Sequence, residues 1–273
     1  MTVADINGDG NLDLIICAES ITVMLGNGQG QFTTVSVTTV PYALFVAVGD
    51  FNLDGKPDLA VSTQAGLVIL PGNGDGTFGP PLPVPAGTDT GAVAVGDFNH
   101  DGKPDLAVAI EHSASLSILF GNGDGSFQPP VSYGVGGYPS SVVVGPFSAA
   151  QSQDLAVANY GSPFQYGTVS VLLDDGTGTF QPAVDSLLGA APQFVAVGDF
   201  NADGKADLAV ADLWSDAISI LTGNGDGTFQ APLSYDVPRQ PYALVIGAFS
   251  GAGTSDLAVA DLVGVTLLTN TTR

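Results

Sequence analysis

The feature that most constrains this chain is a nine-residue pattern that occurs four times. It reads Asp, any residue, Asn, any residue, Asp, Gly, two further residues and Asp, at residues 5–13, 50–58, 97–105 and 199–207. Side-chain oxygens at alternate positions with a glycine at position 6 are typical of a loop that wraps a calcium ion. One match would be weak evidence, because Asp, Asn and Gly also crowd into ordinary turns. Four matches in one register indicate a metal loop.

We therefore predict one Ca²⁺ in each of the four loops. The side chains at positions 1, 3, 5 and 9 are the expected ligands, and position 7 is expected to contribute its backbone carbonyl. The predicted set is Asp5, Asn7, Asp9, Asn11 and Asp13; Asp50, Asn52, Asp54, Lys56 and Asp58; Asp97, Asn99, Asp101, Lys103 and Asp105; and Asp199, Asn201, Asp203, Lys205 and Asp207.

Two more copies of the pattern, at 146–154 and 248–256, keep the frame but lack most of the ligands. Position 1 of the six copies falls at residues 5, 50, 97, 146, 199 and 248, so a repeat returns every 45 to 53 residues. A fixed period in this range predicts a repeat architecture. We expect one domain over residues 1–273, with repeats that start near residues 1, 41, 88, 137, 190 and 239.

Each repeat reads as four short strands. In the second repeat these are residues 42–48, 58–62, 66–70 and a proline-rich stretch at 80–85, with an Asn-Gly-Asp-Gly hairpin turn at 73–76. The pattern predicts an all-β fold: a β-propeller of four-stranded antiparallel blades, with six blades. A seven-bladed ring with a segment missing is the alternative, and a β-sandwich or β-solenoid fits the repeat less well.

The sixth repeat ends after a third strand at residues 265–268, which predicts 23 strands in all. An open blade edge is an aggregation hazard. We therefore expect closure by packing, or self-association through the incomplete edge.

The string from Phe45 to Val61, with Val-Gly-Asp-Phe-Asn at its centre and Asp-Leu-Ala-Val at its end, resembles the FG-GAP/VCBS repeat. This repeat is found in integrin α-subunit propellers and in many bacterial secreted proteins, and the resemblance covers essentially the whole chain. It implies a propeller with calcium in loops on one face. It implies little about the ligand, because the family serves adhesion, glycan binding and enzyme accessory roles. Many family members have seven blades, whereas this chain shows six repeats.

The chain is strongly acidic, with 27 Asp and Glu against 5 Lys and Arg and a net charge of −22. Twelve of these carboxylates lie in the four complete loops. The balance argues against nucleic-acid binding, which needs clustered basic residues, and against anionic membrane surfaces. No membrane-spanning run or signal peptide is expected. Calcium loops of this kind fill at millimolar calcium, so we expect an extracellular or cell-surface location. The single cysteine, Cys17, is expected in the core.

Few side chains in the sequence are suited to catalysis, and we predict no catalytic residue. The best candidate for proton transfer is the Glu111–His112 pair in a connecting loop, which lacks an organised partner. A lyase-like enzyme acting on polysaccharide, or an accessory domain of one, is the second interpretation.

The connections at the end of each blade opposite the calcium loops vary between repeats, as binding loops on a rigid scaffold do. Aromatic rings beside polar side chains suit a sugar or a protein surface. The predicted ligand-binding residues are Trp214, Tyr160, Tyr166, Gln165, Asp89, Asp216 and Gln240. Packing between blades is the competing interpretation of the rings. The sequence thus predicts a non-catalytic, calcium-stabilised binding or adhesion propeller with a glycan or extracellular protein as its partner.

Overall fold

The protein is an all-β propeller with six blades, seen in a computed structural model that describes residues 1–148, 152–161, 166–189, 191–250 and 255–271. These residues fall into two compact units. Unit 1 comprises Met1–Glu111 and Leu116–Ser132, and unit 2 comprises His112–Ser115 and Tyr133–Arg273. The predicted fold class and the six blades are confirmed.

The blades of unit 1 follow the chain. The first blade is built from β1 (Thr2–Ala4), β2 (Asp13–Cys17), β3 (Ile21–Gly26) and β4 (Phe32–Thr38). The second contains β5 (Ala43–Gly49), β6 (Asp58–Thr63), β7 (Gly66–Leu70) and β8 (Leu82–Val84). The third sheet contains β9 (Thr90–Gly96), β10 (Asp105–Ile110), β11 (Ser115–Leu119) and β12 (Val131–Gly134), with the short 3₁₀ helix η1 (Glu111–Ser113) between β10 and β11.

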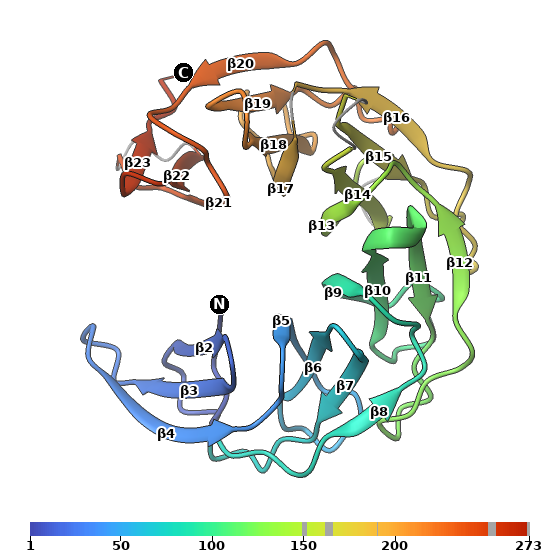
Figure 1. The fold of residues 1–273 in the computed structure, drawn as a ribbon, viewed down its shortest axis with the longest axis vertical. Coiled ribbons are helices and arrows are strands. Elements are labelled where there is room, and N and C mark those ends of the chain that lie inside the picture. Colours follow the sequence, from blue (N-terminus) through green and yellow to red (C-terminus); the bar gives the residue numbers. More distant parts are fainter. Residues whose placement is uncertain (149–151, 162–165, 190, 251–254, 272–273) are drawn as a thin grey trace. The chain divides into compact units, whose positions relative to one another are not determined.

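The remaining blades belong to unit 2. The fourth has β13 (Pro139–Gly145), β14 (Asp154–Asn159), β15 (Thr168–Leu172) and β16 (Val184–Leu187). The fifth has β17 (Pro192–Gly198), β18 (Asp207–Asp212), β19 (Ala217–Leu221) and β20 (Leu233–Asp236). The sixth has three strands: β21 (Ala243–Gly247), β22 (Asp256–Ala260) and β23 (Val265–Leu268). Neighbouring strands in every sheet are consecutive in the chain, as Figure 1 shows.

The antiparallel order sorts the connections of each sheet into two ends. The aspartate-rich loop between the first and second strands lies at the same end as the hairpin between the third and fourth. We call this the aspartate end. The connections between the second and third strands, and between one blade and the next, lie at the other end, which we call the variable end. In the second blade Gly49 pairs with Asp58, so the strand pairing frames the aspartate loop directly.

Within each unit, the core lies between consecutive blades. The second strands β6, β10, β14 and β18 are buried along their whole length. Both of their faces are covered, which explains why they read Asp-Leu-Ala-Val rather than as an alternation of apolar and polar residues. In unit 2, for example, Phe147, Val169 and Leu208 belong to one cluster that spans the fourth and fifth blades.

The strand predictions hold closely within the described residues, including 23 strands and a three-stranded sixth sheet. The predicted strand at 66–70 matches β7, whereas β8 is shorter than the predicted 80–85. Prolines cannot donate to a strand ladder, and this stretch contains four of them. In the part of the chain that the structure covers, no helix has the length and hydrophobicity to cross a membrane.

Cys17 was predicted to lie in the core, but its side chain is only partly buried. The register explains the difference: β1 pairs with β2 only from Asp13 to Ile15, so no first-strand residue pairs with Cys17. Burial still raises the pKa of the thiol.

Candidate functional site

The four complete aspartate loops share one hydrogen-bond pattern. In the second blade, the backbone N–H of Asp54 donates to Oδ1 of Asp50 (3.1 Å) and to Oδ1 of Asn52 (2.9 Å). The N–H of Gly55 donates to Oδ2 of Asp50 (2.9 Å). The N–H of Lys56 donates to Oδ1 of Asp54 (2.9 Å). The other three loops repeat these bonds, so the oxygens at positions 1, 3 and 5 all turn toward the backbone of the loop.

At position 5, the surroundings of Asp9, Asp101 and Asp203 favour the ionised carboxylate by lowering its pKa. A backbone N–H from Asn11 lowers the pKa of Asp9, and one from Lys205 lowers that of Asp203. The Lys103 side chain, whose Nζ lies 3.0 Å from Oδ2 of Asp101, lowers the pKa of that carboxyl. Ionised carboxylates and amide oxygens are hard donors, so the chemistry of positions 1, 3 and 5 fits calcium.

The loops do not gather their acidic groups into a metal cluster. Within the described residues, no three His, Cys, Asp or Glu side chains are placed to hold a metal ion together. The calcium sites, including the backbone carbonyls predicted for Asn11, Lys56, Lys103 and Lys205, therefore stay a prediction.

The aspartate at position 9 is engaged elsewhere. Oδ2 of Asp58 accepts the backbone N–H of Phe51 (3.0 Å), and Oδ1 accepts that of Gly72 (2.7 Å) in the neighbouring hairpin. The side chain is fully buried. Each carboxylate thus fastens the start of the aspartate loop to the end of the third strand. The same arrangement is found at Asp13, Asp105, Asp154, Asp207 and Asp256.

We call these two hydrogen bonds to the position-9 aspartate the latch. The latch joins two backbone segments whether or not the loop carries the other ligands. Asp154 and Asp256 keep it in the two loops that lack the other ligands. The sequence carried the signal, because position 9 is the one ligand position that all six copies retain as aspartate. Burial raises the pKa of Asp105 to about 6 and also raises that of Asp58 and Asp207. Backbone N–H groups lower the pKa of Asp256.

At the variable end of unit 2, the structure brings Tyr160 and Trp214 together. Their rings meet edge to face, with centroids 5.3 Å apart and an interplanar angle of 76°. Tyr160 directly follows β14 in the fourth blade, and Trp214 lies in the short turn between β18 and β19 of the fifth. Trp214 is 54% exposed. The pair therefore presents an aromatic surface across two consecutive blades.

The other predicted ligand-binding residues are placed differently. Tyr166 is 78% exposed in the same connection as Tyr160. Oδ1 of Asp216 accepts the backbone N–H of Gln240 (2.7 Å), so this carboxylate ties the turn that carries Trp214 to the next connection. Asp89 belongs to unit 1. Gln165 lies outside the described residues.

The Glu111–His112 pair forms part of η1, where the His112 ring packs against Tyr138 with centroids 5.8 Å apart.

Two buried polar side chains near the aromatic pair were missed by sequence reasoning. Asn159 precedes Tyr160, and its Nδ2 donates to Oγ of Ser170 (2.8 Å). Asp212 is 1% exposed, and its Oδ2 accepts Oγ–H of Ser219 (2.5 Å). Oδ1 of each has no hydrogen-bond partner among the described residues. Both residues stand five positions after the latch aspartate, which is the signal that could have found them.

Asp212 predicts a pH dependence of stability. Burial raises its folded-state pKa from 3.8 to about 6, so the protonated form is favoured in the folded chain. Its contribution to stability is therefore full below pH 3.8 and is lost as the pH rises through about 6. We expect Asp212→Asn to gain about 2.4 kcal/mol on the wild type between pH 4 and pH 7.5. Urea unfolding of both proteins at each pH checks this, and a constant difference between them would contradict it.

The fold and the repeated loops define the chain as a β-propeller built from aspartate-loop repeats. A family model described as FG-GAP-like repeat matches residues 5–61, 50–108, 151–210 and 199–264, which is more than half of the chain. The chain belongs to this family, and the resemblance seen in the sequence is confirmed. Among curated proteins no sequence match was found.

Solved structures share the fold at low sequence identity. One is an Agrocybe aegerita lectin that specifically recognises non-reducing terminal N-acetylglucosamine; it is 19% identical with a TM-score of 0.62, over 100% of this chain and 80% of that one. Another, BBS1N in complex with ARL6DN, is 18% identical with a TM-score of 0.68, over 97% and 77%. A functionally unknown protein from Desulfotomaculum acetoxidans is 12% identical with a TM-score of 0.64, over 97% and 84%. These identities show a shared fold alone.

Proposed function

We propose that this protein is a glycan-binding propeller whose ligand docks at the variable end of unit 2, on the Tyr160–Trp214 pair. The observation that carries the proposal is the edge-to-face pair itself, which spans two blades and leaves Trp214 54% exposed. Sugar rings have apolar faces that pack on aromatic side chains, and their hydroxyls need polar partners. Tyr166, which is 78% exposed in the same connection as Tyr160, is a further candidate contact.

Two further observations support a glycan. The Agrocybe aegerita lectin, which shares this fold, recognises non-reducing terminal N-acetylglucosamine. The strongly acidic chain, at −22, favours a neutral or cationic ligand over an anionic one. An extracellular protein that carries such a glycan is the partner we expect.

Calcium has an indirect part in this proposal. Bound to the four complete loops, it would neutralise neighbouring carboxylates and fix the aspartate end of those four blades. The ligand would bind at the opposite end of the blades without contacting the ion. This arrangement suits an extracellular or cell-surface setting, where free calcium reaches the millimolar range.

The test is a glycan array followed by titration with the best glycan. Trp214→Ala and Tyr166→Ala should each weaken binding by about 10-fold or more, because stacking and burial on an aromatic ring are lost. Phe249→Ala is the matched control, since Phe249 is an aromatic residue of unit 2 that is 48% exposed but lies in an aspartate loop. If both test variants bound the glycan as tightly as the wild type, the binding site would lie elsewhere on the protein. Cleavage of a polysaccharide in the same assays would favour an enzyme.

A further inference from the structure

The variable end of unit 2 carries a second aromatic contact besides the Tyr160–Trp214 pair. The rings of His112 and Tyr138 meet edge to face, with centroids 5.8 Å apart and an interplanar angle of 70°. Both side chains are exposed, and both residues belong to unit 2. His112 lies in η1, the connection between β10 and β11 of the third blade, and Tyr138 directly precedes β13 of the fourth. This contact, like the Tyr160–Trp214 pair, therefore joins residues from two consecutive blades.

Backbone hydrogen bonding places the two contacts next to each other. The N–H of Tyr160 donates to the carbonyl of Tyr138 (2.9 Å), directly after the paired residues Pro139 and Asn159 of β13 and β14. Residues opposite each other on neighbouring antiparallel strands have Cα atoms only about 5 Å apart. Tyr138 and Tyr160 are thus neighbours at one end of the fourth blade, and each contacts an aromatic residue from a different adjoining blade.

We call His112, Tyr138, Tyr160 and Trp214 the aromatic row. About half of the surface of Tyr138 and of Trp214 is exposed, so the row offers one open ring in the fourth blade and one in the fifth. A sugar ring packs its apolar face on one aromatic ring. Two open rings in one row therefore suit a ligand that contains more than one sugar ring.

Polar groups lie beside the row at its His112 end. The hydroxyl oxygens of Ser113 and Ser115, which directly follow in the chain, are 2.6 Å apart. Hydroxyl groups of this kind both donate and accept hydrogen bonds, as the hydroxyls of a sugar do. The side chains of the row carry no carboxylate, and the chain as a whole carries −22, so an acidic polysaccharide would be repelled on approach.

We propose that the aromatic row binds a neutral linear oligosaccharide along its length, with one sugar ring on Trp214 and another on Tyr138, beside His112. The proposal rests on the proposed function and extends the bound glycan from one sugar to a chain. Recognition of a single terminal sugar would need only the ring of Trp214. Tyr138 is then a second subsite, which sets the length of chain that binds best.

The test measures how affinity depends on chain length. Glucose, mannose and N-acetylglucosamine are each titrated into the full chain by calorimetry in calcium buffer, as the single sugar and as the β-1,4-linked disaccharide, trisaccharide and tetrasaccharide. In the series that binds best, the tetrasaccharide should bind about 10-fold more tightly than the single sugar or better. Tyr138→Ala should remove most of this gain, whereas Trp214→Ala should weaken binding at every length.

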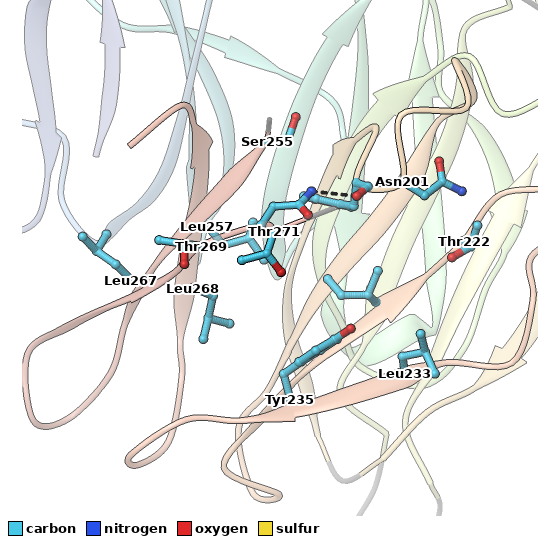
Figure 2. Close-up of a pocket in the computed structure, with 13 residues that line it drawn as sticks. Asn201, Thr222, Leu233, Tyr235, Ser255, Leu257, Leu267, Leu268, Thr269 and Thr271 are labelled. Carbon is cyan, nitrogen blue, oxygen red and sulfur yellow. Dashed lines mark hydrogen bonds between the residues drawn. The ribbon is translucent and has the colours of Figure 1, made fainter. Parts of the chain in front are cut away.

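Two tyrosines serve as controls. Tyr42 is exposed at the equivalent position of the second blade, in unit 1, with a φ of 58° against 54° for Tyr138, so Tyr42→Ala makes the same change in the same backbone conformation. Tyr235 lines a cavity of about 510 Å³ beside the fifth and sixth blades, where Figure 2 shows it with Leu267. This volume is that of a ligand pocket, so Tyr235→Ala tests the other place in unit 2 for a glycan. Neither variant should change the affinity for the tetrasaccharide.

The outcomes separate this proposal from the proposed function. Equal affinity for the single sugar and the tetrasaccharide would overturn the proposal alone, because one subsite would then suffice. No binding at any length would overturn the proposed function as well. A loss of affinity in Tyr42→Ala or Tyr235→Ala as large as that in Tyr138→Ala would also contradict the row as the binding site. The comparison of chain lengths uses the wild-type protein, so it holds even if Tyr138→Ala unfolds the chain.

Discussion

Chelation with EDTA should lower the melting temperature of this protein by on the order of 10 °C, and added calcium should restore it. An ion that binds only the folded chain stabilises it by about 1.4 kcal/mol at ten times its dissociation constant. Four occupied loops would then contribute about 6 kcal/mol, and each kcal/mol moves the melting temperature of a chain of this size by roughly 2 °C. Removing the ions also leaves three carboxylates to repel one another in each loop.

The control for this effect lies within one loop. Asp54→Ala removes a predicted ligand at position 5, and it should reduce the melting shift caused by calcium. Leu53→Ala changes the exposed neighbour at position 4 and should leave that shift unaltered. Thermal unfolding followed by circular dichroism, with and without EDTA, measures all three proteins. A wild-type curve that EDTA does not move would mean that the ions are absent or make no contribution.

Asp154→Ala should lower the free energy of unfolding by about 3–4 kcal/mol, equally in EDTA and in calcium. This carboxylate accepts the backbone N–H groups of Ser148 (2.7 Å) and Asp174 (2.9 Å) and the hydroxyl of Ser152 (2.7 Å). Its removal leaves donors without an acceptor in a part of the chain where the latch residue is fully buried. The loop lacks the other ligands, so a metal cannot account for the loss.

The matched control is Asp175→Ala in the exposed hairpin of the same blade, where the carboxylate accepts bonds from Thr177 within the hairpin. Urea unfolding of both variants should show a large loss for Asp154→Ala and little change for Asp175→Ala. If the loss of unfolding free energy in Asp154→Ala depended on calcium, or were no larger than in Asp175→Ala, the latch would not have the structural role assigned to it.

Local chemistry made much of the fold predictable. The aspartate loops and the Asn-Gly-Asp-Gly turns fix where strands start and stop, so the sixfold repeat, the strand order and the span of β7 follow from spacing alone. Strand β8 and Cys17 were less well predicted, because proline content and the register of β1 set their limits.

The site was less accessible to sequence reasoning, because it depends on contacts between repeats. Tyr160 and Trp214 were each predicted, but their pairing needs two consecutive blades to be placed. The buried Asp212 is one of several aspartates in the sequence, and only its surroundings show that Oδ1 has no partner among the described residues. Position 9 was read as a ligand, and its second role appears only once the hairpin N–H of Gly72 lies 2.7 Å away.

The most direct test of this account is a crystal structure of the protein grown in millimolar calcium with the best glycan from the array. The account predicts calcium in the loops at 5–13, 50–58, 97–105 and 199–207, none at 146–154 or 248–256, and the sugar on Trp214. A sugar coordinated to a loop calcium, or loops without calcium, would contradict it.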